Sequence, residues 1–294
     1  MRQPSPTEAP LLGQQEIDAL IQAGSRAAGH TARRTPLHGS MGNLLSARTG
    51  AGSDFAEVRA YQAGDDPRHI DWRATARSRL PLTRTYHAEL SRPLGLLIDR
   101  CASMRFGTRV RLKAAQALRI ALWLAASAQN EGRETATLLF DQEIHWLPAQ
   151  RGMKGLQALI AQANTPCPPV EPSDGQHWSE PLVMLRRQLP AGSQLVLISD
   201  FNDLQEQDES ALRQLGQHCD TRAVHILDPL EQHWPGSFSA QLHWGTRSMP
   251  TEQRGLLHAE QERWQTHLVE QLQNAGIGYN KLMADSDFPM QEMA

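Results

Sequence analysis

Two aspartates and a serine follow short apolar runs of the chain. Residues 94–98 are almost all aliphatic, and Asp99 ends the run. Residues 195–198 are apolar as well, and Asp200 follows two positions later. Runs of this kind are typical of strands buried on both faces of a parallel sheet, and ligands bind beyond the carboxyl ends of such strands. We therefore expect Asp99, Ser103 and Asp200 to converge there, with the oxygen ligands that hard divalent cations prefer.

The composition indicates a chain with a substantial core and no extreme charge. It has 294 residues, of which 40% are hydrophobic, and a formal net charge of −3. This length allows one large α/β domain with an extension, or two small domains. The near-neutral charge gives no indication of an overall tether to nucleic acid. The 3 cysteines are widely spaced, which predicts neither a disulfide framework nor a zinc site and favours a reducing compartment.

Membrane-spanning and export segments are not expected. The longest apolar run, residues 120–126, is too short to span a bilayer. Residues 1–8 hold no apolar stretch of the kind that a signal peptide has. The sequence therefore predicts no membrane span and a cytoplasmic location.

Strand-like and helix-like segments alternate over residues 94–227. This alternation predicts a doubly wound, mostly parallel α/β sheet. Residues 1–90 are expected to form an irregular or β-rich N-terminal extension, and residues 91–294 the α/β domain. Residues 230–249 are expected to be irregular, and residues 278–283 to add an edge strand. Strands are expected at residues 94–99, 135–140, 143–147, 194–199 and 221–227, and helices at residues 110–129, 154–162, 181–188, 210–218 and 256–274.

The segment from Phe55 to His87 mixes arginines with carboxylates. Two interpretations exist: a basic surface that faces a partner, or an internal lattice of ion pairs that pins an irregular segment. Because the signs alternate so closely, the lattice is favoured. Asp71 and Arg77, close to the apolar Ile70 and Trp72, are then expected to be buried and paired. The charged residues concerned are Glu57, Arg59, Asp65, Asp66, Arg68, Asp71, Arg73 and Arg77.

The same segment resembles the hallmark block of the DUF58 family. The resemblance implies a domain similar to von Willebrand factor A domains, and a role as an accessory or adaptor of MoxR-type AAA+ ATPases rather than as an enzyme. It covers roughly residues 40–230. Other proteins are the implied partners, without nucleic acid. The matching residues are Phe55, Arg59, Ala60, Tyr61, Gly64 to Arg68, Ile70, Asp71, Trp72, Ala76 and Arg77, followed by Asp99, Ser103 and Met104.

The resemblance also implies a metal-ion-dependent adhesion site that binds Mg²⁺. Such a site uses an Asp-x-Ser-x-Ser turn, a threonine from a later loop and an aspartate after a further strand. Asp99 and Ser103 match the first and last positions of the turn, and Asp200 matches the later aspartate. Cys101 replaces the middle serine, and the threonine loop expected at residues 149–152 has no threonine. A thiol is a poor ligand for Mg²⁺, so a degenerate site is predicted.

Arginines offer a substitute for the missing ligands. Two interpretations exist. Either Arg151, or alternatively Arg100, reaches the paired carboxylates and partly replaces Mg²⁺, because a guanidinium group is planar and always charged, or both arginines are solvated. Together with Arg68 and Arg73, these two arginines are also the expected partner-binding residues.

Three functions are compatible with these residues, and a non-enzymatic protein-interaction module is favoured. Asp99 and Asp200 could instead be the carboxylate pair of a metal-dependent hydrolase. The segment from Arg68 to Arg84 could instead bind nucleic acid. The sequence has no Gly-rich phosphate loop, no Gly-x-Ser-x-Gly turn and no His-Glu-x-x-His motif, so it indicates no hydrolytic apparatus beyond the two carboxylates.

Overall fold

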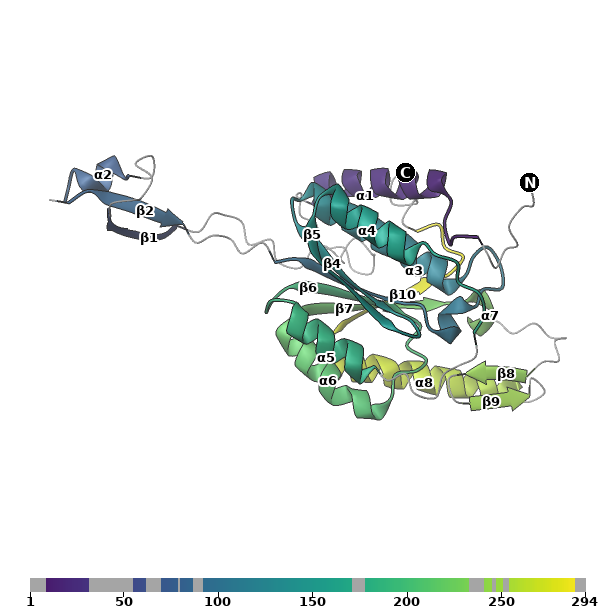
Figure 1. Cartoon of the computed structure of the whole chain (residues 1–294). Coiled ribbons are helices and arrows are strands. Elements are labelled where there is room, and N and C mark those ends of the chain that lie inside the picture. The colour runs from purple at the N-terminus through teal and green to yellow at the C-terminus, as the bar shows by residue number, and fades with distance from the viewer. Residues whose placement is uncertain are drawn as a thin grey trace. The chain divides into compact units, whose positions relative to one another are not determined.

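The computed structural model describes residues 9–31, 55–61, 70–78, 80–86, 92–170, 178–232, 241–244, 247–250 and 254–288. The chain divides into two compact units. Unit 1 comprises Met1–Leu45 and Arg92–Ala294, and unit 2 comprises Ser46–Ser91. Figure 1 labels the helices and strands of both units.

A six-stranded sheet forms the middle layer of unit 1 (Figure 1). Only β5 runs antiparallel to its neighbour. The chain enters the sheet at β3, adds β4 and β5 on one side, and then returns to add β6, β7 and β10 on the other, which is a doubly wound arrangement. The predicted fold class is confirmed, and it is consistent with a von Willebrand factor A-like fold. In sheet order the strands are β10 (Gly278–Met283), β7 (Asp220–Leu227), β6 (Gln194–Ser199), β3 (Leu94–Asp99), β4 (Glu134–Phe140) and β5 (Ile144–Arg151).

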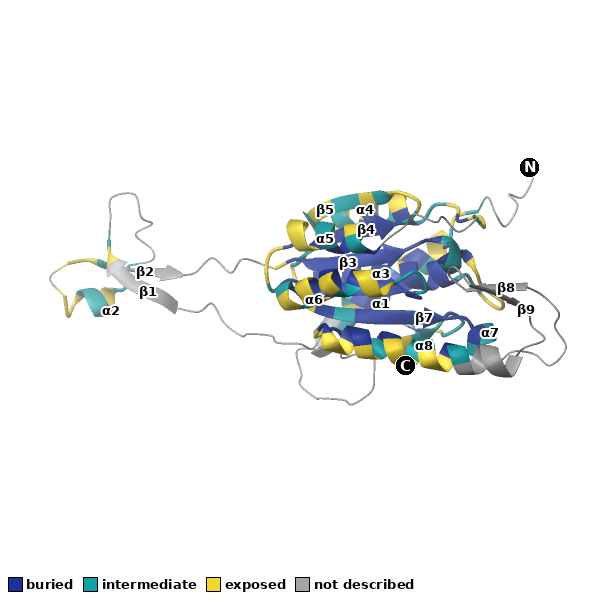
Figure 2. Ribbon diagram, turned by 90° about the horizontal axis from the view of Figure 1, so that it is seen from below, coloured by how far each residue is buried: buried dark blue, intermediate teal, exposed yellow. Residues whose placement is uncertain are grey.

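A layer of helices covers each face of this sheet (Figure 1). Successive side chains of a strand point to opposite faces, so Leu96 and Ile98 lie in one core cluster and Leu97 in the other. The central strands are correspondingly buried (Figure 2). One layer consists of α1 (Gln14–Thr31), α3 (Lys113–Asn130) and α4 (Met153–Ala163), and the other of α5 (Ser179–Gln188), α6 (Glu209–His218) and α8 (Arg254–Asn274).

Helix α3 is buried around nearly its whole circumference. It packs on β3 and is flanked by α1 and α4, which explains why its sequence has no broad polar face. The approach of α1 is close: a Cβ atom added at Gly24 would lie 2.3 Å from the carbonyl oxygen of Trp123. Although α3 is so apolar, neither it nor any other helix of the described residues is long and apolar enough to cross a membrane.

Helix α1 precedes unit 2 in the chain but belongs to unit 1. Its apolar residues Ile17 and Leu20 share a core cluster with Leu118 and Leu122 of α3. Unit 2 is therefore inserted between α1 and β3, whereas the predicted division at residue 90 assigns α1 to an extension. The sequence shows the amphipathic pattern of α1 but gives no sign of its partner, because α3 lies far along the chain.

The segment after β7 is more regular than its sequence indicates. Residues 230–249, predicted to be irregular, include most of α7 (Pro229–Gln232) and the antiparallel pair β8 (Gln241–Trp244) and β9 (Arg247–Pro250). That prediction is corrected. Strands of four residues are too short for a two-residue periodicity to stand out. The predicted edge strand at residues 278–283 is confirmed as β10.

Unit 2 consists of a hairpin and a short helix. Strands β1 (Phe55–Ala60) and β2 (Leu82–Tyr86) pair antiparallel, and α2 (Trp72–Thr75) lies between them in sequence. Arg77 is exposed, and Trp72 is 70% exposed. The predicted burial of Arg77 is therefore wrong, because the neighbouring tryptophan faces solvent and provides no apolar surroundings. Asp71 is half-buried and caps α2, accepting hydrogen bonds of 3.0 Å from the backbone N–H groups of Arg73 and Ala74.

Replacing Asp71 with alanine should loosen α2. Loss of an N-cap side chain typically costs about 1 kcal/mol, well below the cost of stranding a buried charge. Amide hydrogen exchange at Arg73 and Ala74 should accelerate by roughly fivefold, which corresponds to about 1 kcal/mol. The exposed Arg77→Ala serves as the control and should leave both amides unchanged; equal effects of the two substitutions would contradict the capping role.

Candidate functional site

Four aspartates line the carboxyl edge of the sheet, one at the end of each of four adjacent strands. Asp99 is the last residue of β3, and the other three directly follow β4, β6 and β7. In sheet order this aspartate row reads Asp141, Asp99, Asp200 and Asp228. The row forms because parallel strands end at one edge, so residues far apart in sequence meet there.

The connection between β3 and α3 bonds to every member of the row. This edge segment, residues 100–112, includes the 3-10 helix η3 (Ala102–Arg105). Arg105 forms an ion pair with Asp141, the Cys101 N–H donates to Asp99 Oδ1 at 2.8 Å, and the Thr108 N–H donates to Asp228 Oδ2 at 2.8 Å. Ser103 Oγ donates to Asp200 Oδ1 at 3.0 Å. The edge segment is thus anchored across four strands.

Asp200 belongs to a buried ionic network. Lys113, the first residue of α3, places its Nζ 2.7 Å from Asp200 Oδ2 and 2.6 Å from Glu231 Oε1. Asn202 Nδ2 donates to the same Asp200 oxygen at 2.9 Å. Lys113 and Asp200 are each 1% exposed. Burial by itself lowers the pKa of Lys113, but the charges of Asp200 and Glu231 outweigh it and leave that pKa above its usual range.

Asp99 lies beside this network, and within the described part of the chain no cationic side chain forms an ion pair with it. The Ser199 hydroxyl donates to Asp99 Oδ2, and the Phe201 N–H donates to Ser199 Oγ at 2.8 Å. Burial, followed by the charge of Asp200, raises the pKa of Asp99 to about 7, against the opposing hydrogen bonds from Ser199 and Cys101. Asp99 is therefore a carboxyl group that takes up a proton near neutral pH.

The residues at this edge do not fit the Mg²⁺ ion that the resemblance implies. The ammonium group of Lys113 already binds Asp200, and its charge repels a second cation. The Cys101 sulfur lies 3.7 Å from the carbonyl oxygen of Phe140 and belongs to the core. Burial raises the pKa of the Cys101 thiol, so it is also a poor nucleophile. Among the described residues, no group of three or more His, Cys, Asp and Glu side chains is arranged to hold a metal ion.

The cation at this site is Lys113 rather than either predicted arginine. Arg151 pairs with Glu134 in the register of the antiparallel β4–β5 pair, so it lies at the amino edge of the sheet. Arg100 is 5% exposed, donates to the carbonyl groups of Gln162, Ala163 and Pro166, and has its Nε 3.6 Å from Asp141 Oδ2 rather than at Asp99 or Asp200. Both predicted replacements for Mg²⁺ are therefore wrong.

Two of the four predicted partner-binding arginines are open to solvent. Arg73 is exposed on α2, and the Arg151 side chain is 62% exposed on β5. Arg100 is corrected from a partner-binding residue to a buried one that fixes the loop after α4. Arg68 lies outside the described residues.

The residues predicted for this edge did not include Lys113, Glu231 or Thr108. One feature of the sequence points to Lys113. It is a lysine at the start of an otherwise apolar helix, where its charged group has little contact with solvent and needs a buried partner. No such feature points to Glu231 and Thr108, because their partners are 118 and 120 residues away. Glu231 has a second contact, because its Oε2 accepts a hydrogen bond of 2.7 Å from the Asp228 N–H.

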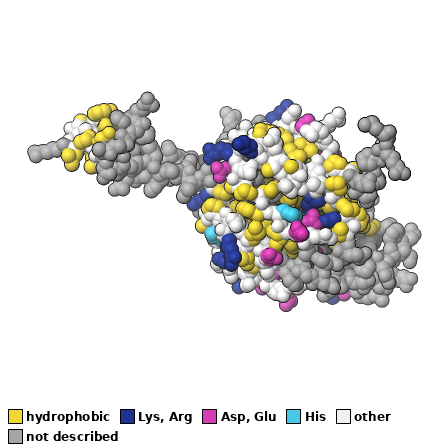
Figure 3. Space-filling model, in the orientation of Figure 1, with side chains coloured by type: hydrophobic (Ala, Val, Ile, Leu, Met, Phe, Trp, Pro, Cys, Tyr) yellow, Lys and Arg dark blue, Asp and Glu magenta, His cyan; other side chains and the backbone are white. Residues whose placement is uncertain are grey.

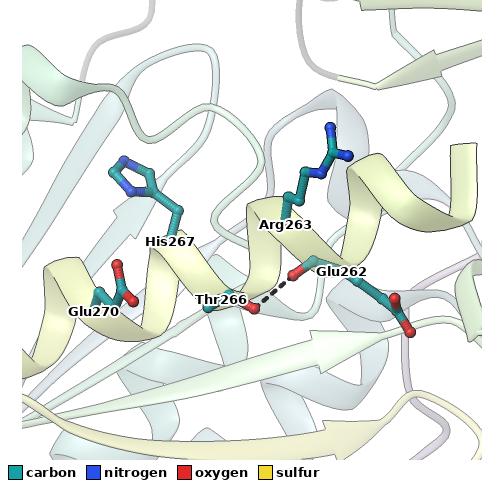
Figure 4. Close-up of a pocket in the computed structure, with 5 residues that line it drawn as sticks. All are labelled: Glu262, Arg263, Thr266, His267 and Glu270. Carbon is teal, nitrogen blue, oxygen red and sulfur yellow. Dashed lines mark hydrogen bonds between the residues drawn. The ribbon is translucent and has the colours of Figure 1, made fainter. Parts of the chain in front are cut away.

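Neither alternative function gains support from the described residues. Asp99 and Asp200 are 3% and 1% exposed, so a substrate would not reach them as a hydrolytic pair. On the face shown in Figure 3, acidic and basic side chains are interspersed, without the single-sign patch typical of a nucleic-acid surface. A cavity of about 360 Å³ on α8 is lined by residues of that helix and by no member of the aspartate row (Figure 4); its residues are Glu262, Arg263, Thr266, His267 and Glu270.

The edge segment also presents apolar side chains to solvent. Phe106 is 41% exposed and Val110 is 67% exposed. Arg109 lies between them in sequence, with its side chain 67% exposed and 3.6 Å from Asp285. Phe106 and Val110 therefore lie exposed on a segment that the aspartate row fixes in position.

Two crystal structures match this chain at low similarity. The conserved hypothetical protein BatB from Bacteroides thetaiotaomicron matches 68% of this chain and 94% of its own, with 12% identity and a TM-score of 0.44. An aerotolerance-related membrane protein from Bacteroides fragilis matches 68% of this chain and 95% of its own, with 13% identity and a TM-score of 0.39.

Sequence comparison identifies relatives with a higher identity to this chain. Uncharacterized proteins of Mycobacterium bovis and Mycobacterium tuberculosis are 29% identical over 206 residues, which cover 68% of this chain and 62% of theirs. The chain thus spans less than two thirds of the length of these relatives. The family model described as protein of unknown function DUF58 matches residues 57–248, which include the block around Asp71 and the whole aspartate row. The chain belongs to the DUF58 family.

Proposed function

We propose that the protein is a non-enzymatic protein-interaction module that acts as an accessory of a MoxR-type AAA+ ATPase. The observation that supports this most directly is the pair Phe106 and Val110, which are exposed on the anchored edge segment. Binding loses less entropy when the binding residues are already fixed, and the four aspartates fix this segment in advance. The ATPase is the partner that the family resemblance implies.

The chemistry of the edge segment indicates what the partner should offer. Two apolar side chains flank Arg109 in sequence, so the complementary surface has an apolar pocket with a carboxylate at its rim. The buried network beneath contributes rigidity rather than contacts, because Lys113 and Asp200 are each 1% exposed. Association should therefore depend on the shape and apolarity of the edge segment and be independent of Mg²⁺.

The double variant Phe106→Ser/Val110→Ser should bind the purified MoxR-type ATPase of the same organism at least tenfold more weakly than the unmodified chain. Loss of central apolar anchors typically costs 1 to 2 kcal/mol or more at an interface, and about 1.4 kcal/mol is tenfold. Calorimetric titration measures the effect, with and without ATP and Mg²⁺. Thermal unfolding should be unchanged, since both side chains are already exposed.

Met153→Ser is the matched control, because Met153 is 49% exposed and begins α4 rather than the edge segment. It should bind the ATPase as the unmodified chain does. An ATPase that does not bind the unmodified chain, or binds the double variant equally well, would contradict the proposed function.

A further inference from the structure

We infer that the Lys113 ammonium is a built-in cation that takes the place of a divalent metal ion at the carboxyl edge, and that one substitution converts this network into a divalent-cation site. The Nζ atom lies between oxygens of two carboxylates, at 2.7 Å from Asp200 and 2.6 Å from Glu231. These distances are close to the 2.3–2.6 Å of Ca²⁺–oxygen contacts and longer than the ~2.0–2.1 Å of Mg²⁺–oxygen contacts, so a smaller ion would draw the two carboxylates inward. The ammonium thus occupies the position that an ion would need.

The oxygens around Nζ are held in place by groups other than Lys113. Asp200 Oδ2 accepts from Asn202 Nδ2, and Asp200 Oδ1 accepts from Ser103 Oγ and from the Asn202 N–H at 3.2 Å. Glu231 is oriented by the Asp228 N–H at its other oxygen. Removing the ammonium should therefore leave two oriented carboxylates around a space without charge compensation.

Two oriented carboxylates form a suitable starting set for a hard cation. Mg²⁺ commonly uses one or two carboxylates and keeps several waters, and Mn²⁺ accepts the same ligands. In the unmodified chain the ammonium prevents this, because an entering ion would have to displace it from a nearly dry environment. The substitution Lys113→Met keeps a side chain of similar length and removes only the charge and the donors.

The test is a titration of the full chain with Mn²⁺, followed by electron paramagnetic resonance of free Mn²⁺ and by thermal unfolding. The unmodified chain should bind no Mn²⁺ at this site, and its Tm should be the same within about 1 °C in chelator and in 10 mM Mn²⁺. Lys113→Met should have a lower Tm in chelator, bind one Mn²⁺ per chain, and regain several degrees on addition of the ion, because a ligand of the folded state stabilises by mass action.

Two further variants separate this inference from a general effect of losing a buried cation. Lys113→Met/Asp200→Asn should lose the bound Mn²⁺. Arg119→Met removes another buried cation of α3, the ion-pair partner of Glu16, and should lower Tm without creating a Mn²⁺ site.

Several outcomes would overturn the inference. One is a Mn²⁺ ion bound to the unmodified chain and lost in Asp200→Asn. Another is a folded Lys113→Met chain that binds no ion. If Lys113→Met stays unfolded even with Mn²⁺, the neutral variant Lys113→Gln, which keeps both carboxylates and supplies an amide donor beside them, decides: bound Mn²⁺ supports the inference, and its absence rejects it.

Discussion

Replacing Asp200 with alanine should lower the free energy of unfolding by about 3–5 kcal/mol, the usual cost of removing one partner from a buried ion pair. The substitution leaves the Lys113 ammonium with the carboxylate of Glu231, at a position that is 1% exposed. It also removes the acceptor of the Ser103 hydroxyl and of the Asn202 side chain. Urea unfolding followed by circular dichroism measures the loss.

Asp287→Ala is the matched control for this prediction. Asp287 also faces a cation, but its side chain is 68% exposed and lies 4.0 Å from Arg111. Exposed pairs of this kind contribute about 1 kcal/mol or less. Comparable losses for the two variants would show that burial of the Asp200 network adds nothing to stability.

Asp99→Asn should stabilise the protein at pH 8, in contrast to Asp200→Ala. The pKa of Asp99 is raised from 3.8 to about 7, so above pH 7 the folded protein contains a buried, charged carboxylate that lowers its stability. A shift of about three units corresponds to at most about 4 kcal/mol. Asparagine keeps the shape and has no charge. Part of the gain is lost because the Ser199 hydroxyl must find another acceptor.

The pH dependence gives the sign of this effect. Between pH 3.8 and about 7 the folded state holds a proton on Asp99 that the unfolded state has released, so this group's contribution to stability is greatest below pH 4 and is lost as the pH rises to about 7. The difference in unfolding free energy between Asp99→Asn and the unmodified chain should therefore grow from pH 4 to pH 8. Burial lowers the pKa of His225 to about 3, which gives a slope of opposite sign, but that slope is common to both proteins and cancels.

Asp141→Asn provides a control of opposite sign at the same edge. Asp141 is paired with Arg105, so removing its charge should destabilise the protein at pH 8. If Asp99→Asn destabilises to the same extent and without dependence on pH, the Asp99 carboxyl group is ionised and well compensated, contrary to the arrangement described above.

The sheet could be predicted because each of its buried strands can be recognised from a few consecutive residues. Each buried strand reads as a short aliphatic run, and the aspartate that ends it marks the edge, so Asp99 and Asp200 could be assigned to one edge from sequence. The cation that joins them could not be identified. Lys113 is separated from Asp200 by 87 residues, and no periodicity indicates which charge a helix brings to a sheet.

The error at Arg151 has a topological cause. The strand predicted at residues 143–147 is β5, which pairs antiparallel with β4 and so returns the chain to the opposite edge of the sheet. Arg151 ends β5 beside Glu134, the first residue of β4, so it could not have been near Asp99. In unit 2 the alternating charges suggested burial, whereas a hairpin with a four-residue helix has too little apolar surface to bury Arg77.

The insertion of unit 2 between α1 and β3 also has a consequence for synthesis. Residues 32–112 separate the end of α1 from the start of α3, and a ribosome that adds about 5–20 residues per second needs about 4–16 s to make them. During that interval Ile17 and Leu20 have left the exit tunnel without the helix that will cover them. Unit 2 can form its hairpin meanwhile. Unit 1, whose first helix is made earliest, is the later of the two to be completed.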